Sequence, residues 1–299
     1  MNNNTAITSL VARELYDSRG VPTIEVDVSV ADAEGRCAAP FGAPGSRGEF
    51  EASAYGDLGV SGAVAAVNGE VGAALVGLDA ADISGVDRAL RELDGTANFE
   101  HLGGNTSSSI SIASAVAAAR ALRQPLYRFA GGERAATLPI PLGNVIGGGA
   151  HALGPTPDMQ EHLVLPVSSR TVREAVQLNI AVHEQAGRVL AARDPNFTGG
   201  SDDERAWAAD LDDTAALEVI EEAAAQVSAQ TGASFRLGLD LAADRFWDKA
   251  DGVYRYQRAA LTLTPAQQID FVESLCDRFN LGYVEDPFES TDFASFAEL

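Results

Sequence analysis

FRLGLD at residues 235–240 and YVEDP at residues 283–287 are the two stretches that indicate the fold class. In each, a short apolar strand pattern stops at a carboxylate, Asp240 in the first and Glu285 in the second. Between them, TPAQ at residues 264–267 has the capping-box pattern and the early proline of a helix start. A strand, a helix and a second strand in this order predict a parallel βα unit, and therefore an α/β fold, here part of a barrel.

The same alternation of strands and helices begins near residue 138. Apolar runs at 138–146 and 162–166 add two expected strands, so we expect about four strands in this part of the chain. A closed eight-stranded α/β barrel takes roughly 200 residues or more. We therefore expect residues 138–299 to form an incomplete TIM-like barrel, its first half, with the last helix at 291–299.

The preceding residues have a different organisation. PTIEVDVSV at 22–30 alternates apolar and polar residues as a half-buried strand does, and we expect 7–16 to pair with it around the DSRG turn at 17–20. Strands come first and helices afterwards, which predicts a separate α+β domain over residues 1–132, with the boundary in GGER at 131–134. The alanine-rich helical patterns lie at about 59–76, 83–93 and 106–122.

The charge of the chain restricts its partners. There are 43 Asp and Glu residues against 21 Lys and Arg, which gives a formal net charge of −22. A surface of this sign repels the phosphates of nucleic acids and of anionic membranes, so we expect neither as a partner. Lys249 is the single lysine. An excess of carboxylates with almost no lysine is typical of a halophilic protein, because a salt-rich cytoplasm screens the repulsion.

Other features of the composition concern the compartment. No stretch approaches the roughly 20 apolar residues of a membrane helix, and MNNNTAITSL at 1–10 lacks the basic and apolar regions of a signal peptide. We therefore expect a cytoplasmic protein. Cys37 and Cys276 lie far apart with no Cys/His spacing, which argues against a disulfide framework or a zinc site.

A few residues are candidates for chemistry on spacing alone. Asp240 and Glu285 follow consecutive strands, so they are expected at the carboxyl rim, where they either share a hard cation such as Mg²⁺ or cap the next helices. Glu204 lies in an acidic loop between helices and by itself indicates a solvated surface. His151 follows the glycines of 147–149 and is either structural or exposed to an anion.

Several motifs, in order along the whole chain, resemble those of the enolases, the phosphopyruvate hydratases of glycolysis. The resemblance implies an enolase-like N-terminal domain, an enolase-type barrel, and a lyase that dehydrates 2-phosphoglycerate to phosphoenolpyruvate with Mg²⁺. Its substrate would be a small phosphorylated carboxylate. The motifs are DSRGVPTIEV at 17–26, LDGT at 93–96, LGGN at 102–105, LPIP at 138–141, NV at 144–145, GGAHA at 148–152, MQE at 159–161, GLD at 238–240 and VEDPF at 284–288.

The resemblance also implies roles for individual carboxylates. Asp240 and Glu285 resemble two of the three carboxylates that hold the catalytic Mg²⁺. Glu204 falls where the family has the acid that assists departure of the hydroxyl, and Glu161 matches the glutamate that works beside it. Removal of a proton next to a carboxylate creates an enediolate dianion, which needs nearby positive charge, and the leaving hydroxyl needs a positioned acid.

The remaining implied residues contact the substrate. His151, Gln160 and Glu161 match substrate-contacting positions, and Glu285 lies beside them as a further expected contact. We place the expected substrate site at these residues, next to the expected metal site.

The sequence departs from the family pattern in several places. The loop at 41–48 is longer and has Phe41 where a metal-binding serine belongs. Gly147 stands where the family has a second asparagine, and the loop at 201–208 has lost the glycines of the family loop. The family's lysine base and third metal ligand belong to later barrel strands.

These departures leave alternatives to an active enolase. The altered loops at 41–48 and 201–208 are compatible with a divergent lyase that acts on another carboxylate. A non-catalytic remnant, or a subunit that completes its barrel with another chain, is a second class of function. A homo-oligomer is also expected among the partners, and the expected absence of a base predicts that these 299 residues alone are inactive.

Overall fold

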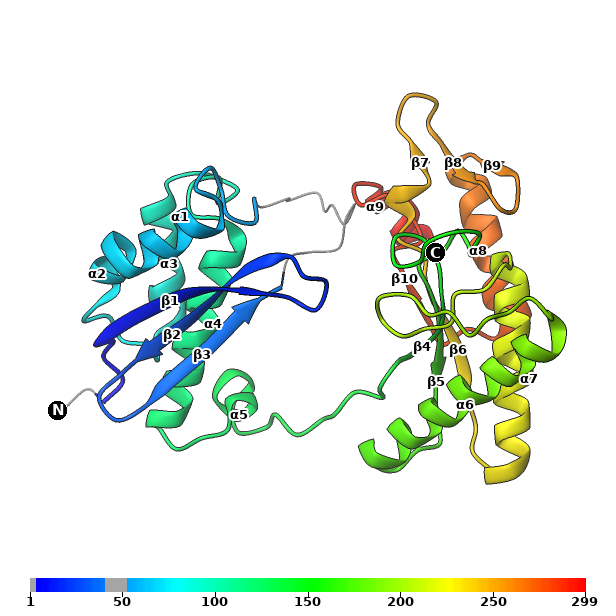
Figure 1. Cartoon of the computed structure of the whole chain (residues 1–299), viewed down its shortest axis with the longest axis horizontal. Helices are drawn as coiled ribbons and strands as arrows, with labels where there is room; N and C mark the ends of the chain where they lie inside the picture. The colour runs from blue at the N-terminus through cyan, green and yellow to red at the C-terminus, as the bar shows by residue number, and fades with distance from the viewer. Residues whose placement is uncertain (1–3, 41–52) are drawn as a thin grey trace. The chain divides into compact units, whose positions relative to one another are not determined.

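The computed structural model describes residues 4–40 and 53–299 (Figure 1). The altered loop expected at 41–48 lies outside the described residues. The chain divides into two compact units, with described residues 4–40 and 53–137 in the first and 138–299 in the second. We retain 1–132 and 138–299 as the proposed domain boundaries.

A three-stranded antiparallel sheet opens the first unit. Its order is β1 (Ser9–Tyr16), β2 (Pro22–Ser29), β3 (Glu34–Ala39). The hairpin between β1 and β2 is closed by Asp17, whose Oδ1 accepts hydrogen bonds from the backbone N–H groups two and four residues on, at 2.8 and 3.0 Å. Gly20 has φ +74°, a conformation that favours glycine. The predicted DSRG turn and its strand pairing are therefore confirmed.

Helices cover one face of this sheet, as the strand-then-helix order predicts. β3 packs tightly against α4: a Cβ at Gly35 would lie only 1.9 Å from the carbonyl oxygen of Ala113. Only glycine therefore fits there. The helices are α1 (Gly59–Ala66), α2 (Gly72–Leu75), α3 (Ile83–Asp94), α4 (Gly104–Ala121) and α5 (Leu126–Gly131). Val67–Val71 joins α1 to α2 and is kinked at Gly69.

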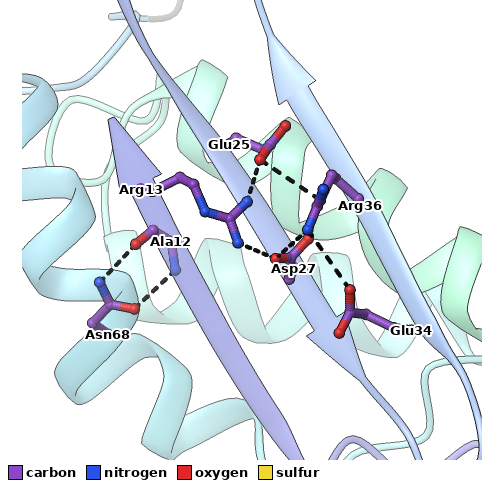
Figure 2. A network of polar contacts seen from close by, with 7 residues as sticks. All are labelled: Ala12, Arg13, Glu25, Asp27, Glu34, Arg36 and Asn68. Carbon is purple, nitrogen blue, oxygen red and sulfur yellow. Dashed lines mark hydrogen bonds and ion pairs between the residues drawn. The ribbon is translucent and has the colours of Figure 1, made fainter. Parts of the chain in front are cut away.

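Charged side chains gather on the other face of the sheet around Asp27 (Figure 2). Asp27 is only 6% exposed because two arginines cover it. Arg36 Nε and Nη2 donate hydrogen bonds to the Asp27 carboxylate at 2.5 and 2.9 Å. Arg13 donates to the carboxylates of both Asp27 and Glu25. The Arg36 and Arg13 guanidiniums lower the pKa of Asp27 below its ordinary value, against the opposing effect of burial.

The outer edge of β1 is also closed by a side chain. Asn68, in the kinked segment between α1 and α2, accepts a hydrogen bond from the N–H of Ala12 at 2.8 Å and donates to the Ala12 carbonyl at 2.9 Å (Figure 2). The amide therefore takes the place of a neighbouring strand, which protects part of an edge that would otherwise offer free backbone groups.

The second unit contains a four-stranded sheet in the order β10-β6-β5-β4. Among the described residues it does not close into a barrel, in agreement with the expected incomplete barrel. The apolar side chains of these strands pack against helices in one buried core, which Cys276 joins as a partly buried residue. The strands are β4 (Gly143–Gly147), β5 (Glu161–Leu165), β6 (Arg236–Asp240) and β10 (Tyr283–Glu285).

The expectation of parallel strands is correct only for β6 and β10, which are joined through α8 (Pro265–Phe279). It is wrong for β4 with β5 and for β5 with β6, which are antiparallel. No helix joins β4 to β5. Two helices, α6 (Val172–Arg193) and α7 (Asp213–Thr231), join β5 to β6. A single helix between two strands carries the chain back to the end of the sheet at which the first strand began, so the next strand is parallel to it. Two successive helices carry the chain back to the end at which the first strand finished, so the next strand is antiparallel.

Helix starts follow the sequence closely. Thr264 and Gln267 form a complete capping box at the start of α8, with proline at the first helical position. The start of α6 has only half of such a box: Thr171 accepts a hydrogen bond from the N–H of Glu174, but Glu174 Oε2 accepts from the N–H of Arg170 rather than from that of Thr171. The last helix, α9 (Phe293–Glu298), lies where we expected it.

A small antiparallel sheet, which the sequence did not predict, is inserted between β6 and α8. Its order is β7 (Trp247–Asp248), β8 (Val253–Tyr256), β9 (Leu261–Leu263). Lys249 lies in the turn between β7 and β8. Within the described ranges, none of the helices has the length and apolar character needed to cross a bilayer.

We expect Asp27→Ala to lower the free energy of unfolding by roughly 1–2 kcal/mol, since it removes several charged hydrogen bonds at a buried position. The pKa of Asp27 is lowered in the folded state, so its contribution is present above the ordinary carboxyl pKa of about 3.9 and is lost as pH falls through the lowered value. Urea denaturation of the whole chain between pH 7 and pH 2 measures both effects.

Glu34→Ala is the matched control. Its carboxylate lies 3.8 Å from Arg36 and its side chain is 54% exposed, so we expect almost no change. Equal losses in the two variants would contradict a special role for Asp27.

Candidate functional site

The candidate site lies along one edge of the four-stranded sheet. This edge holds the carboxyl ends of β4, β6 and β10 but the amino end of β5, because β5 runs in the opposite direction. Glu161 is paired with Asp240, and Asp240 with Glu285, in the register of neighbouring strands. Three carboxylates therefore come from three adjacent strands at the same level.

Asp240 is the buried member of this row, only 6% exposed. Its Oδ2 accepts a hydrogen bond from Gln160 Nε2 at 3.0 Å and its Oδ1 from the N–H of Ala242 at 2.9 Å. Burial and the Glu285 carboxylate nevertheless raise the pKa of Asp240 to about 6. Oxygens of Asp240, Glu285 and Asp286 lie within 4.8 Å of one another. The set fits a hard divalent cation, which would relieve this repulsion.

A second group lies beside the first and contains His151, Glu161 and Glu204. Their ligand atoms also lie within 4.8 Å of one another. Burial raises the pKa of Glu161 to about 8, with further increases from Glu204 and Asp240. Burial and the neighbouring carboxylates therefore favour a proton on the Glu161–Glu204 pair in the absence of a bound cation.

Polar contacts orient the second group. His151 Nδ1 lies 2.7 Å from Asp203 Oδ1 and 3.8 Å from Glu204 Oε1. Asn144 Nδ2 donates to Glu204 Oε2 at 3.2 Å. One histidine nitrogen is therefore engaged by Asp203, and the tautomer is set by this contact.

Two buried side chains, Asp213 and His162, hold the start of β5 in place. Asp213, at the start of α7, accepts a hydrogen bond from the N–H of Met159 at 2.8 Å. Its Oδ1 also lies 3.5 Å from Nε2 of His162, whose side chain is fully buried. The segment that carries Gln160 and Glu161 is therefore fixed to the first turn of α7.

The structure brings together all six residues that the sequence analysis proposed, namely His151, Gln160, Glu161, Glu204, Asp240 and Glu285. Their roles stay predictions. Sequence reasoning missed three neighbours: Asn144, Asp203 and Asp286. Asp286 was adjacent to a quoted strand end and has φ +41°, as a turn residue does, yet its carboxylate joins the acidic group. No local signal could pair Asp203 with His151, since 52 residues separate them.

Two family models match the chain, one over most of each unit. The family model described as enolase, N-terminal domain, matches residues 7–130, and the model described as enolase, C-terminal TIM barrel domain, matches residues 135–299. The chain is 41% identical to the enolase of Methanosphaera stadtmanae over 296 residues, which is 99% of this chain and 71% of that protein.

Other relatives give similar values. The enolase of Methanothermobacter thermautotrophicus is 42% identical over 98% of this chain and 70% of its own length. The enolase of Halorubrum lacusprofundi is 42% identical over 99% of this chain and 72% of its own length.

The raised pKa of Glu161 predicts that the metal-free protein loses stability as pH rises. Between the ordinary carboxyl value and about 8, the folded state binds more protons than the unfolded state, so the free energy of unfolding falls with increasing pH. Glu161→Gln should flatten this dependence and raise stability at pH 8 by about 1–2 kcal/mol, since solvent screening reduces the full linkage value.

Urea denaturation of the wild type and Glu161→Gln, in the presence of a chelator and between pH 5 and pH 8.5, measures the free energy of unfolding at each pH. Glu221→Gln, on the exposed side of α7, is the control and should keep the wild-type pH dependence. A Glu161→Gln profile parallel to that of the wild type would refute the raised pKa.

Proposed function

The chain belongs to the enolase family, and we propose that the acidic edge of its second unit binds Mg²⁺ and a phosphorylated hydroxy-carboxylate. An enolase-like lyase removes a proton from one carbon and a hydroxyl from the next, forming a carbon–carbon double bond and water. We propose 2-phosphoglycerate as the substrate and phosphoenolpyruvate as the product. The observation that carries the proposal is the convergence of His151, Glu161 and Glu204 beside the Asp240–Glu285 pair.

Asp240 and Glu285 are the proposed metal ligands, and Asp286 offers a further oxygen. Carboxylate oxygens are the ligands that Mg²⁺ prefers. When bound, the cation supplies positive charge that makes a dianionic enediolate tolerable. Gln160 holds one oxygen of Asp240 and so limits the directions in which that carboxylate can turn.

Glu204 is the proposed acid for the leaving hydroxyl, and Glu161 acts beside it. Two carboxyl groups this close do not both ionise easily, so they hold at least one proton between them at neutral pH. A held proton next to the hydroxyl can be donated as the carbon–oxygen bond breaks. His151, oriented by Asp203, is the proposed contact for the anionic part of the substrate.

A second candidate role is that of a subunit that works with further strands. Val172, Val176 and Ile180 lie four residues apart on α6 and are 42–53% exposed. Phe293 and Phe296 of α9, after β10, are 64% and 39% exposed. Exposed apolar side chains on α6, which packs against β4, and on α9, which follows β10 in the chain, favour cover by further strands, on the same polypeptide or on another chain, or by a second copy. We also propose a cytoplasmic location for the protein.

For the metal site, we expect calorimetry to detect weak Mg²⁺ binding, with a dissociation constant on the order of 1 mM, and Asp240→Ala to abolish it. Asp270→Ala, which removes an exposed carboxylate on α8, should titrate like the wild type. Indistinguishable titrations of the wild type and Asp240→Ala would remove this assignment.

For activity, we expect a polypeptide of these 299 residues alone to form no phosphoenolpyruvate from 2-phosphoglycerate. Enolase-superfamily sites take the proton from carbon with a lysine or histidine. The single lysine, Lys249, lies in the β7–β8 turn and not among the residues of the acidic edge, and His151 is assigned to substrate contact. Addition of a polypeptide with the remaining barrel strands should restore turnover.

The activity assay has a clear opposite outcome. Steady product formation by the homogeneous chain, lost in Glu204→Gln and kept in Glu221→Gln, would show that these residues include the base and would overturn this prediction.

A further inference from the structure

Asp202 is a buried carboxylate that the proposed mechanism does not use. It lies two residues before Glu204 and is only 9% exposed. Its Oδ1 accepts hydrogen bonds from the N–H groups of Glu204 and Ala206, both at 2.9 Å. Its own N–H donates to the carbonyl of Ala206 at 2.9 Å. The side chain and backbone of Asp202 therefore close a tight turn with Glu204 inside it.

The other oxygen of Asp202 lies directly against Gly147, the last residue of β4. A Cβ at Gly147 would lie 1.7 Å from Oδ2 and 2.8 Å from Cγ of Asp202. Gly147 does not have a positive φ. Glycine is therefore required at this position for space and not for backbone conformation, because the carboxylate occupies the room that any side chain would need.

The far end of the turn is attached to the same strand. The N–H of Trp207 donates to the carbonyl of Val145 at 2.9 Å, and the N–H of Gly147 donates to the carbonyl of Trp207 at 3.1 Å. The Trp207 ring stacks on His183, with ring centroids 4.7 Å apart, and its Nε1 donates to the His183 carbonyl at 2.8 Å. The turn is thus held at Trp207 by backbone pairing and at Asp202 by the fit to Gly147.

Asp202 Oδ2 has no hydrogen-bond partner among the described residues. Burial of a carboxylate oxygen without a partner is unfavourable. Burial also raises the pKa of Asp202, although the bonds from Glu204 and Ala206 oppose this. Because this burial is unfavourable for the carboxylate itself, we look for its role in the conformation of the backbone that it binds, at Glu204 and Ala206.

We propose that Asp202 is a positioning residue, which seats the Glu204 turn by filling the space over Gly147. The role of Glu204 as acid rests on the proposed function, but the seating of its turn does not. Gly147 and Asp202 form a complementary pair: the absent side chain at one position is the space for the carboxylate at the other.

Amide hydrogen exchange of the 299-residue protein tests the seating directly. Asp202→Ala should lower the protection of the Glu204 and Ala206 amides by roughly tenfold, since each loses its acceptor. Asp202→Asn keeps an acceptor oxygen and should keep most of the protection. Asp194→Ala is the matched control: Asp194 accepts from the N–H of Asn196 in a similar turn at the end of α6, so the Glu204 and Ala206 amides should not change.

A double-mutant cycle tests the fit to Gly147. Gly147→Ala alone should also lower the protection of these two amides, because its Cβ displaces the carboxylate. In the Asp202→Ala background the same substitution should add little, since the next neighbour of that Cβ is Ala206 Cβ at 3.4 Å. Each variant is also made in a Trp247→Phe background, in which Trp207 is the single tryptophan. A Trp207 fluorescence spectrum like that of the same background without the other substitutions shows that the variant is folded.

Two results would overturn the proposal: unchanged protection in Asp202→Ala, or additive effects of the two substitutions. The exchange measurement needs no substrate and no turnover. A wrong assignment of Glu204 as the acid would appear as Glu204→Gln without effect on an active complex, while the amide protection and its coupling to Gly147 would still follow this prediction.

Discussion

The repulsion among carboxylates at one edge of the second sheet is the constraint on which the candidate site depends. Glu161, Asp240 and Glu285 face one another across neighbouring strands, and Glu204 joins them from a loop. Burial and like charges raise the pKa values of Glu161 and Asp240, so binding of a proton or a cation relieves the repulsion there. The same repulsion is the physical basis for proposing that this edge binds a hard cation and holds a proton that can be donated.

The first unit treats a buried carboxylate in the opposite way. Asp27 lies between two arginines, and its pKa is lowered instead of raised. Its charge is neutralised within the fold, so it stabilises the sheet and offers nothing to a ligand. The contrast with Asp240 separates a structural carboxylate from a candidate functional one. Both are 6% exposed, but burial and the Glu285 carboxylate raise the pKa of Asp240, whereas the arginines beside Asp27 outweigh the effect of burial.

Strand direction decides how the site is assembled. The two helices between β5 and β6 reverse β5 relative to its neighbour, so Gln160 and Glu161 come from the start of a strand while Asp240 and Glu285 come from strand ends. Residues before one strand and after others therefore meet at the same edge. The loop after α6 then adds Glu204, held against β4 by Trp207 and by the fit of Asp202 to Gly147.

The sequence by itself determined the DSRG hairpin, the start of α8 at Thr264 and, through its motifs, the six candidate site residues. These features depend on residues close in sequence or on patterns carried by short motifs. Only the tertiary structure decided the antiparallel pairing of β5, the β7–β9 sheet, the His151–Asp203 contact and the space that Gly147 leaves for Asp202. Such contacts join residues far apart along the chain, so they depend on how whole elements pack, and no local pattern of charge or hydrophobicity encodes them.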